Sequence, residues 1–224
     1  MNTGNRMKKA IVIGSTGMVG SQLIQLLIEN EEYSEIVSLV RRVSGVTSLK
    51  LKEHVVNFDE PETWSKFVKG NVLFSALGTT IAQAKTKENQ YNIDFTIQYT
   101  VAKIAACNGV NQYVLISSAG SYIDSKTFYL KMKGELEFAV QSLPFETISI
   151  LRPGLLTGIR PHIRPGEKTG YLILKGLNKL GLFKRYKPIE ASKVAKAMIM
   201  AAKENKSSTY TLNEIFGLIE SMNI

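Results

Sequence analysis

The 224-residue sequence contains one cysteine, Cys107, and two histidines, His54 and His162. A single cysteine excludes an internal disulfide, and the two isolated histidines do not supply the ligand spacing of a zinc site, so no bound metal is expected. No apolar run approaches the roughly 18 residues that a membrane-spanning helix requires. The first apolar run ends before Gly14, too early for a secretion signal. These absences favour a cytoplasmic protein with no membrane span.

Acidic residues are in the minority, with 19 Asp and Glu against 28 Lys and Arg, for a net charge of +9. The excess is concentrated between Arg160 and Lys206, where twelve basic residues face three glutamates. A solvated face is the ordinary explanation, and an anionic ligand or acidic lipid headgroups are the alternatives. Because no pattern of aromatic residues accompanies these charges, binding of nucleic acid is not expected.

Short β-branched runs alternate with amphipathic stretches over the first 150 residues. This alternation predicts an α/β fold: a Rossmann-like, doubly wound parallel sheet with helices on both faces, in a single domain over 1–224. The expected strands are Lys9–Ile13, Ile36–Val40, His54–Phe58, Val72–Ser75, Gln112–Ser117 and Glu146–Leu151. The expected helices are Met18–Glu29, Pro61–Val68, Gln90–Cys107 and Phe128–Ser142.

The alternation breaks after Gly154. We expect residues 155–190 to form a small, basic substrate-side segment within the domain, with helices around Tyr171–Leu180 and Glu190–Lys203. The last stretch, Tyr210–Ile224, fits either a strand or a helix.

A glycine-rich turn, Gly14-Ser15-Thr16-Gly17-Met18-Val19-Gly20, follows the first predicted strand and opens the first predicted helix. The first glycine permits a tight turn, the second leaves room for a pyrophosphate, and the third lets the helix approach the strand. The helix N-terminus then presents N–H groups to the phosphates. Glycine triplets also occur in ordinary turns, but this strand–turn–helix context predicts binding of a dinucleotide.

The residues after the second predicted strand indicate which dinucleotide is bound. NAD sites usually carry an Asp or Glu there for the ribose hydroxyls, whereas this sequence has Arg41 and Arg42. Guanidinium groups suit a 2′-phosphate, so NADP(H) is favoured over NAD(H), with a surface arginine pair as the alternative. Ligands in such sheets bind at the carboxyl ends of strands, where Asp59 is expected near the adenine and Leu77-Gly78 beneath the cofactor.

Tyr129 and Lys133 are four residues apart in a predicted helix and therefore share one face. A lysine ammonium stabilises a nearby phenolate, which makes such a pair a general acid. Ser118, at the end of a predicted strand, is placed to hold the substrate oxygen. Tyr122 and Lys126 have the same spacing but lie in a loop-like run, so Tyr129 is preferred.

Five segments together resemble the extended and atypical branch of the short-chain dehydrogenase/reductases: the glycine turn, Ala76–Thr80, Ile116–Ala119, Tyr129–Lys133 and Leu151–Gly154. Within that branch the chain is most similar to the oxidoreductase group that includes the human HIV Tat-interactive protein. The likeness runs from Lys8 to about Lys203. It implies Tyr129 as catalytic acid/base, Lys133 as its assistant and a ligand of the nicotinamide ribose, and Ser118 as the third member.

The same resemblance implies which residues contact the cofactor. They are Ser15, Thr16, Met18 and Val19 in the turn, Arg41 and Arg42 at the 2′-phosphate, and Leu77, Gly78, Leu156 and Arg164. The expected function is an NADP(H)-dependent oxidoreductase acting on a small carbonyl or alcohol substrate.

Two alternatives stay open. One is an NADP(H)-sensing regulator whose basic segment binds a protein partner. The other is a nucleotide-sugar epimerase or dehydratase, placed second because the region after Gly154 is brief. A homodimer is expected from the resemblance alone.

Overall fold

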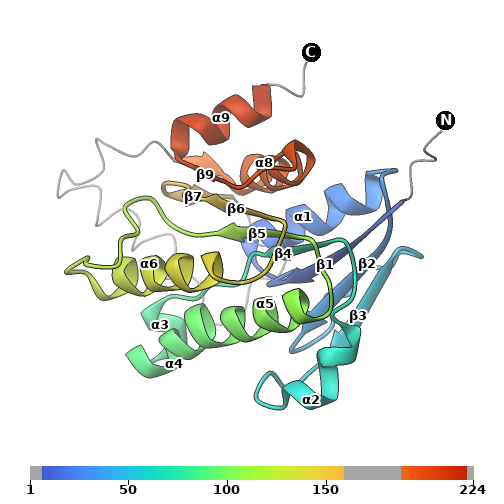
Figure 1. The fold of residues 1–224 in the computed structure, drawn as a ribbon, viewed down its shortest axis with the longest axis horizontal. Coiled ribbons are helices and arrows are strands. Elements are labelled where there is room, and N and C mark those ends of the chain that lie inside the picture. The colour runs from blue at the N-terminus through green and yellow to red at the C-terminus, as the bar shows by residue number, and fades with distance from the viewer. Residues whose placement is uncertain (1–6, 159–187, 221–224) are drawn as a thin grey trace.

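The computed structural model describes residues 7–158 and 188–220, and a parallel sheet forms the centre of that part of the chain (Figure 1). The sheet has seven strands in the order β3-β2-β1-β4-β5-β6-β9. These strands are β1 (Lys8–Ile13), β2 (Tyr33–Val40), β3 (Leu51–Val55), β4 (Val72–Ser75), β5 (Gln112–Ile116), β6 (Thr147–Leu151) and β9 (Ser208–Tyr210). The first six follow the Rossmann order 3-2-1-4-5-6, and β9 extends the sheet beyond β6. The predicted fold class is therefore confirmed.

The central strands are buried on both faces. Ala10, Ile11, Val12 and Ile13 of β1 are all fully buried, as expected for a parallel strand covered by helices on each side. Alternate residues point to opposite faces, so Ala10 and Val12 join one core while Ile11 and Ile13 join the other. The uninterrupted apolar run in the sequence follows from this double burial.

Helices cover both faces of the sheet (Figure 1). One layer contains α1 (Met18–Glu29), α8 (Ala191–Glu204) and α9 (Leu212–Glu220), whose apolar residues form a core with Val12 and Phe74. The opposite layer contains α2 (Pro61–Trp64), α5 (Ile97–Cys107) and α6 (Phe128–Gln141), which pack on Ile11, Leu73 and Leu115. The sheet thus separates two hydrophobic cores.

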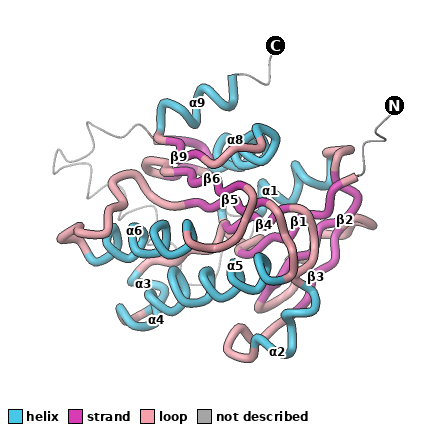
Figure 2. Tube along the Cα trace, viewed as in Figure 1, coloured by secondary structure: helices cyan, strands magenta, loops and turns pink. Residues whose placement is uncertain are grey.

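Several expected elements differ from the structure: β2 begins at Tyr33 rather than Ile36, and the predicted helix Pro61–Val68 is α2 followed by a 3-10 turn at Ser65–Phe67. The third strand is Leu51–Val55 rather than His54–Phe58. The predicted helix Gln90–Cys107 is divided into α4 (Lys87–Tyr91), a π-helical segment η2 (Asn92–Thr96) and α5, and α3 (Ile81–Ala84) precedes it. Figure 2 shows α3, α4 and α5. The C-terminal stretch contains both β9 and α9.

A short parallel ladder joins β7 (Leu156–Thr157) to β8 (Ile189–Glu190). It holds the two chain segments on either side of residues 159–187 next to each other. The predicted helix Tyr171–Leu180 and most of the segment 155–190 lie outside the described residues. No helix in the described ranges is long and apolar enough to cross a membrane.

Candidate dinucleotide site

The turn between β1 and α1 leaves no space for a side chain at Gly14. Gly14 has φ +79°, a conformation that favours glycine, and a Cβ there would lie 2.4 Å from the backbone of Ala76 and Leu77. The Gly17 N–H closes the turn by donating to the Gly14 carbonyl at 2.9 Å. Gly17 is also the N-cap of α1 and supplies no side-chain cap, so N–H groups of the first turn are available to phosphate oxygens.

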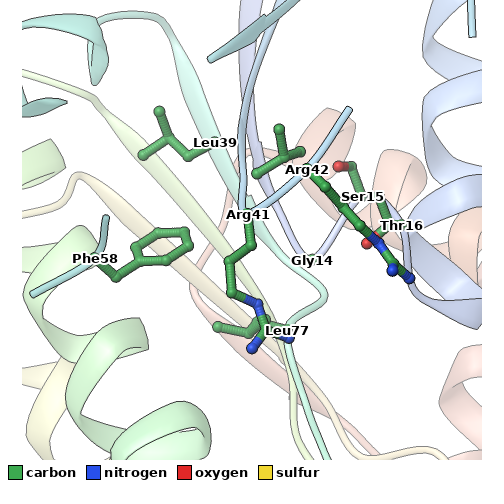
Figure 3. Close-up of a pocket in the computed structure, with 9 residues that line it drawn as sticks. Gly14, Ser15, Thr16, Leu39, Arg41, Arg42, Phe58 and Leu77 are labelled. Carbon is green, nitrogen blue, oxygen red and sulfur yellow. The ribbon is translucent and has the colours of Figure 1, made fainter. Parts of the chain in front are cut away.

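A cavity of about 340 Å³ opens beside this turn (Figure 3). Its lining residues are Gly14, Ser15, Thr16, Leu39, Val40, Arg41, Arg42, Phe58 and Leu77. The two exposed arginines follow β2 directly, and in Figure 3 the Arg41 side chain extends toward Leu77 while Arg42 extends toward Thr16. None of the nine lining residues is acidic. The cavity therefore combines a phosphate-binding turn with two cations.

A second cavity, of about 740 Å³, shares Arg41 and Phe58 with the first. Asp59 lines it, together with Ile93 and Ile97 from the opposite layer of helices. Asp59 is exposed and lies in the loop after β3, separated from that strand by three residues. The lining of this cavity thus combines apolar side chains with Arg41.

Ser15, Val19 and Met18, which were also predicted to contact the cofactor, make contacts within the protein. The Ser38 hydroxyl donates to the buried Ser15 hydroxyl at 2.7 Å, which ties the turn to β2. Val19 packs in the core below α1, so only its backbone can face a phosphate. Met18 is half-buried and lies near Gly158, whose Cβ would be 3.7 Å from the Met18 thioether.

Two predicted cofactor contacts lie beyond the large strands. Leu156 is half-buried in β7 and packs against the core of the α1 layer. Arg164 lies outside the described residues. The position of Gly158 beside Met18 nevertheless shows that the chain leaves β7 close to the glycine turn.

Tyr129 and Lys133 share one face of α6, as their spacing predicts. The Lys133 Nζ lies 5.9 Å from the centre of the Tyr129 ring, and Tyr129 is half-buried. Tyr122 lies in a turn outside the helix and is 61% exposed, so the matching spacing to Lys126 does not place those two side chains on one helical face. The structure thus distinguishes the two Tyr-Lys pairs.

The loop that carries Ser118 folds back onto α6. The Ser121 N–H donates to the Ser118 carbonyl at 3.1 Å, and the Tyr122 N–H donates to the Leu130 carbonyl at 3.3 Å. This approach requires glycine at 134, where a Cβ would lie 2.4 Å from the Tyr122 backbone. The loop that begins at Ser118 therefore contacts α6 through Tyr122, at Leu130 and Gly134.

A buried carboxylate that the sequence analysis did not identify lies beside this pair. Asp94, in η2, is fully buried, and its Oδ1 is 2.8 Å from the Lys133 Nζ. A pattern in the sequence could have revealed it: Gln90, Asp94 and Gln98 recur every four residues on the buried face of their helix. Polar residues on a buried stripe need hydrogen-bond partners, so this pattern predicts a buried polar network.

Comparison with known proteins identifies a family and several relatives of this chain. A family model described as the NAD dependent epimerase/dehydratase family matches residues 10–143. A protein named fmp52, mitochondrial, from Emericella nidulans is 36% identical over 78% of this chain and 78% of its own length. Its counterpart FMP52 from Candida albicans is also 36% identical, over 84% and 85%.

Solved structures share the fold at low identity. The Bordetella bronchiseptica enzyme WbmH, in complex with NAD+, has a TM-score of 0.70 at 15% identity, covering 97% of this chain and 82% of that one. A UDP-glucose 4-epimerase from Thermotoga maritima, with UDP-glucose, has a TM-score of 0.68 at 16% identity, covering 96% and 82%.

These comparisons bear on the expected cellular location and on the expected family. The relatives are named mitochondrial proteins, so the expectation of a cytoplasmic location is wrong. The likeness to the extended short-chain branch is supported, whereas the relatives found carry the FMP52 name rather than that of the Tat-interactive group.

Proposed function

Since the chain belongs to the NAD dependent epimerase/dehydratase family, we propose that it is an NADP(H)-dependent oxidoreductase acting on a small carbonyl or alcohol. The observation that carries the choice of cofactor is the cavity beside the glycine turn, where Arg41 and Arg42 are the charged residues among the nine described residues of the lining. Two guanidinium groups stabilise a 2′-phosphate and offer no acceptor to a free ribose diol.

In this proposal the turn and the N-terminus of α1 bind the pyrophosphate. Asp59 and the larger cavity accept the adenine, and Leu77 and Gly78 lie beneath the ribose and pyrophosphate. Leu156 and Arg164, from the segment after β6, make further contacts with the cofactor. The dinucleotide, when bound, supplies the hydride.

The proton comes from the protein. Tyr129 donates its phenolic proton to the carbonyl oxygen of the substrate as general acid. The ammonium of Lys133 stabilises the phenolate that remains, and it also binds the nicotinamide ribose. The Ser118 hydroxyl donates a hydrogen bond to the same substrate oxygen and fixes its position.

Isothermal titration of cofactor-free protein with NADPH and NADH tests this proposal. The wild type is compared with a variant in which Arg41 and Arg42 are both alanine. We expect the variant to lose NADPH affinity by about tenfold or more, because charge-assisted hydrogen bonds are removed, and to bind NADH as the wild type does. Absence of binding of either nucleotide to the wild type would refute the proposal.

A nucleotide-sugar epimerase or dehydratase is the second candidate, favoured by the family description and by the UDP-glucose bound to the Thermotoga maritima neighbour. That function predicts that UDP-glucose raises the melting temperature of the cofactor-loaded protein. It also predicts that NAD(P) stays bound during purification. The oxidoreductase proposal predicts neither stabilisation by the sugar nucleotide nor a retained cofactor.

A further inference from the structure

Lys133 and Asp94 form a buried ion pair at the site. Their side chains are 3% and 0% exposed, and the Nζ–Oδ1 distance is 2.8 Å. The second carboxylate oxygen, Oδ2, accepts a hydrogen bond of 2.8 Å from the backbone N–H of Thr79. One carboxylate therefore contacts both α6, which carries Tyr129 and Lys133, and the loop after β4, which the proposed function places beneath the ribose and pyrophosphate of the cofactor.

Folding alone does not account for this pair. A buried ion pair is often no more stabilising than apolar residues of similar volume, because both charges lose their hydration. The chain nevertheless builds a dedicated setting for Asp94: a π-helical segment, a form that is frequent at functional sites. The Asp94 carbonyl also accepts a 2.7 Å hydrogen bond from the buried Gln98 amide.

Gly78 completes this setting. Gly78 lies beside the carboxylate, since a Cβ on this residue would be in ordinary van der Waals contact with Asp94 Oδ1, at 3.4 Å. The same loop continues from Leu77, which lines the cavity beside the glycine turn. The position of Asp94 is therefore tied to that of the loop by both packing and hydrogen bonding.

Three groups act on the charge of Lys133. Burial by itself lowers the pKa of an ammonium, yet the pKa of Lys133 is raised, because the Asp94 carboxylate, Tyr129 and Glu137 together outweigh burial. Glu137 forms its ion pair with Arg152. Asp94, by contrast, is in direct contact with the ammonium of Lys133. An ammonium has three donors. The ion pair with Asp94 therefore does not occupy all of the donors of this ammonium.

We propose that Asp94 is a positioning residue of this site, whose carboxylate fixes the ammonium of Lys133 with one oxygen and the backbone of Thr79 with the other. This inference rests on the proposed function, since it assigns Lys133 to the nicotinamide ribose. In this role Asp94 sets the distance between the loop after β4 and helix α6. It keeps Lys133 charged and directs its remaining donors toward the ribose and Tyr129.

The test separates the two halves of the cofactor. Wild type and Asp94→Asn are titrated calorimetrically with NADPH and with adenosine 2′,5′-bisphosphate, which has the 2′-phosphate but no nicotinamide ribose. We expect Asp94→Asn to weaken NADPH binding by about tenfold, the effect of one misplaced charged hydrogen bond, and to bind the bisphosphate as the wild type does. Lys131→Met, which removes an exposed charge from the same helix, is the matched control and should bind both ligands normally.

Each other outcome is decisive. Unchanged NADPH affinity in Asp94→Asn, or an equal loss for both ligands, overturns the positioning role while leaving the proposed function intact. A wild type that binds neither ligand overturns the proposed function and this inference with it. Retained bisphosphate binding also shows that the variant is folded. If Asp94→Asn does not fold, Asp94→Glu, which keeps the charge but displaces it by one methylene, should show the same selective loss.

Discussion

The carbonyl oxygen of Gly14 lies only 2.0 Å from the point that a Cβ atom on Gly20 would occupy. Replacing Gly20 with alanine should therefore push α1 away from the turn. Overpacking of this kind lowers the free energy of unfolding by about 1–3 kcal/mol. Because the same movement separates the N–H groups from the pyrophosphate position, we also expect weaker NADPH binding, measured by calorimetry and urea unfolding.

Gly217→Ala is the matched control for that substitution. Gly217 lies inside α9, and a Cβ there meets nothing within 4 Å. Alanine is the better helix former by about 1 kcal/mol, so this variant should be as stable as the wild type or more so. A Gly20→Ala protein with wild-type stability and NADPH affinity would contradict the close approach.

Tyr129→Phe tests the proton donor. The phenyl ring preserves packing on α6 but has no proton to give, so we expect turnover to fall by about 100-fold or more with unchanged NADPH affinity. The assay is NADPH oxidation with a carbonyl compound that the wild type reduces. Tyr122→Phe removes a hydroxyl from the exposed tyrosine of the other Tyr-Lys pair and should retain full activity. Equal activity of Tyr129→Phe and wild type would exclude the mechanism.

The elements with strong local signals were predicted correctly. Helix α1 and strand β4 have the predicted bounds, because a glycine turn or a wholly apolar run marks them. The prediction placed the third strand three residues too late in the sequence. β-forming residues occur throughout residues 51–58, and β3 lies at a sheet edge, where burial does not fix the register. The periodicity of the sequence does not reveal where a strand that is only half buried ends.

Only those parts of the candidate site that have a local sequence motif were predicted. Tyr129 and Lys133 share a helical face, which spacing alone reveals, and Arg41 and Arg42 follow a recognisable strand. Asp94 lies 39 positions from Lys133, and the π-helical segment that turns it inward has no spacing signature. Contacts between distant segments depend on how helices pack across the sheet, which local patterns do not determine.

Glu137→Gln should destabilise the protein. Glu137 is buried, and its carboxylate accepts from Arg152 Nε at 3.1 Å and from the Ser121 hydroxyl. Neutralising it leaves the partly exposed guanidinium of Arg152 without its charged partner, for an expected loss of about 2 kcal/mol in the free energy of unfolding.

Lys131→Met provides the contrast on the same helix. Lys131 forms an exposed pair with Glu135 at 3.9 Å, and pairs of this kind contribute about 0.5 kcal/mol or less. Urea unfolding of both variants measures the difference. Similar losses in the two would show that burial does not strengthen the Glu137 interaction.

The raised pKa of Lys133 predicts how stability depends on pH. A lysine titrates near 10.4 in the unfolded chain. Because the folded pKa is higher, the pairing of Lys133 with Asp94 contributes its full stability below about pH 10 and loses it as pH rises through the folded pKa. Asp94→Asn should accordingly melt below the wild type at neutral pH, and the gap should narrow on the alkaline side. Melting temperatures of both proteins from neutral to strongly alkaline pH measure this gap; one that stays constant would show that ionisation of Lys133 does not control it.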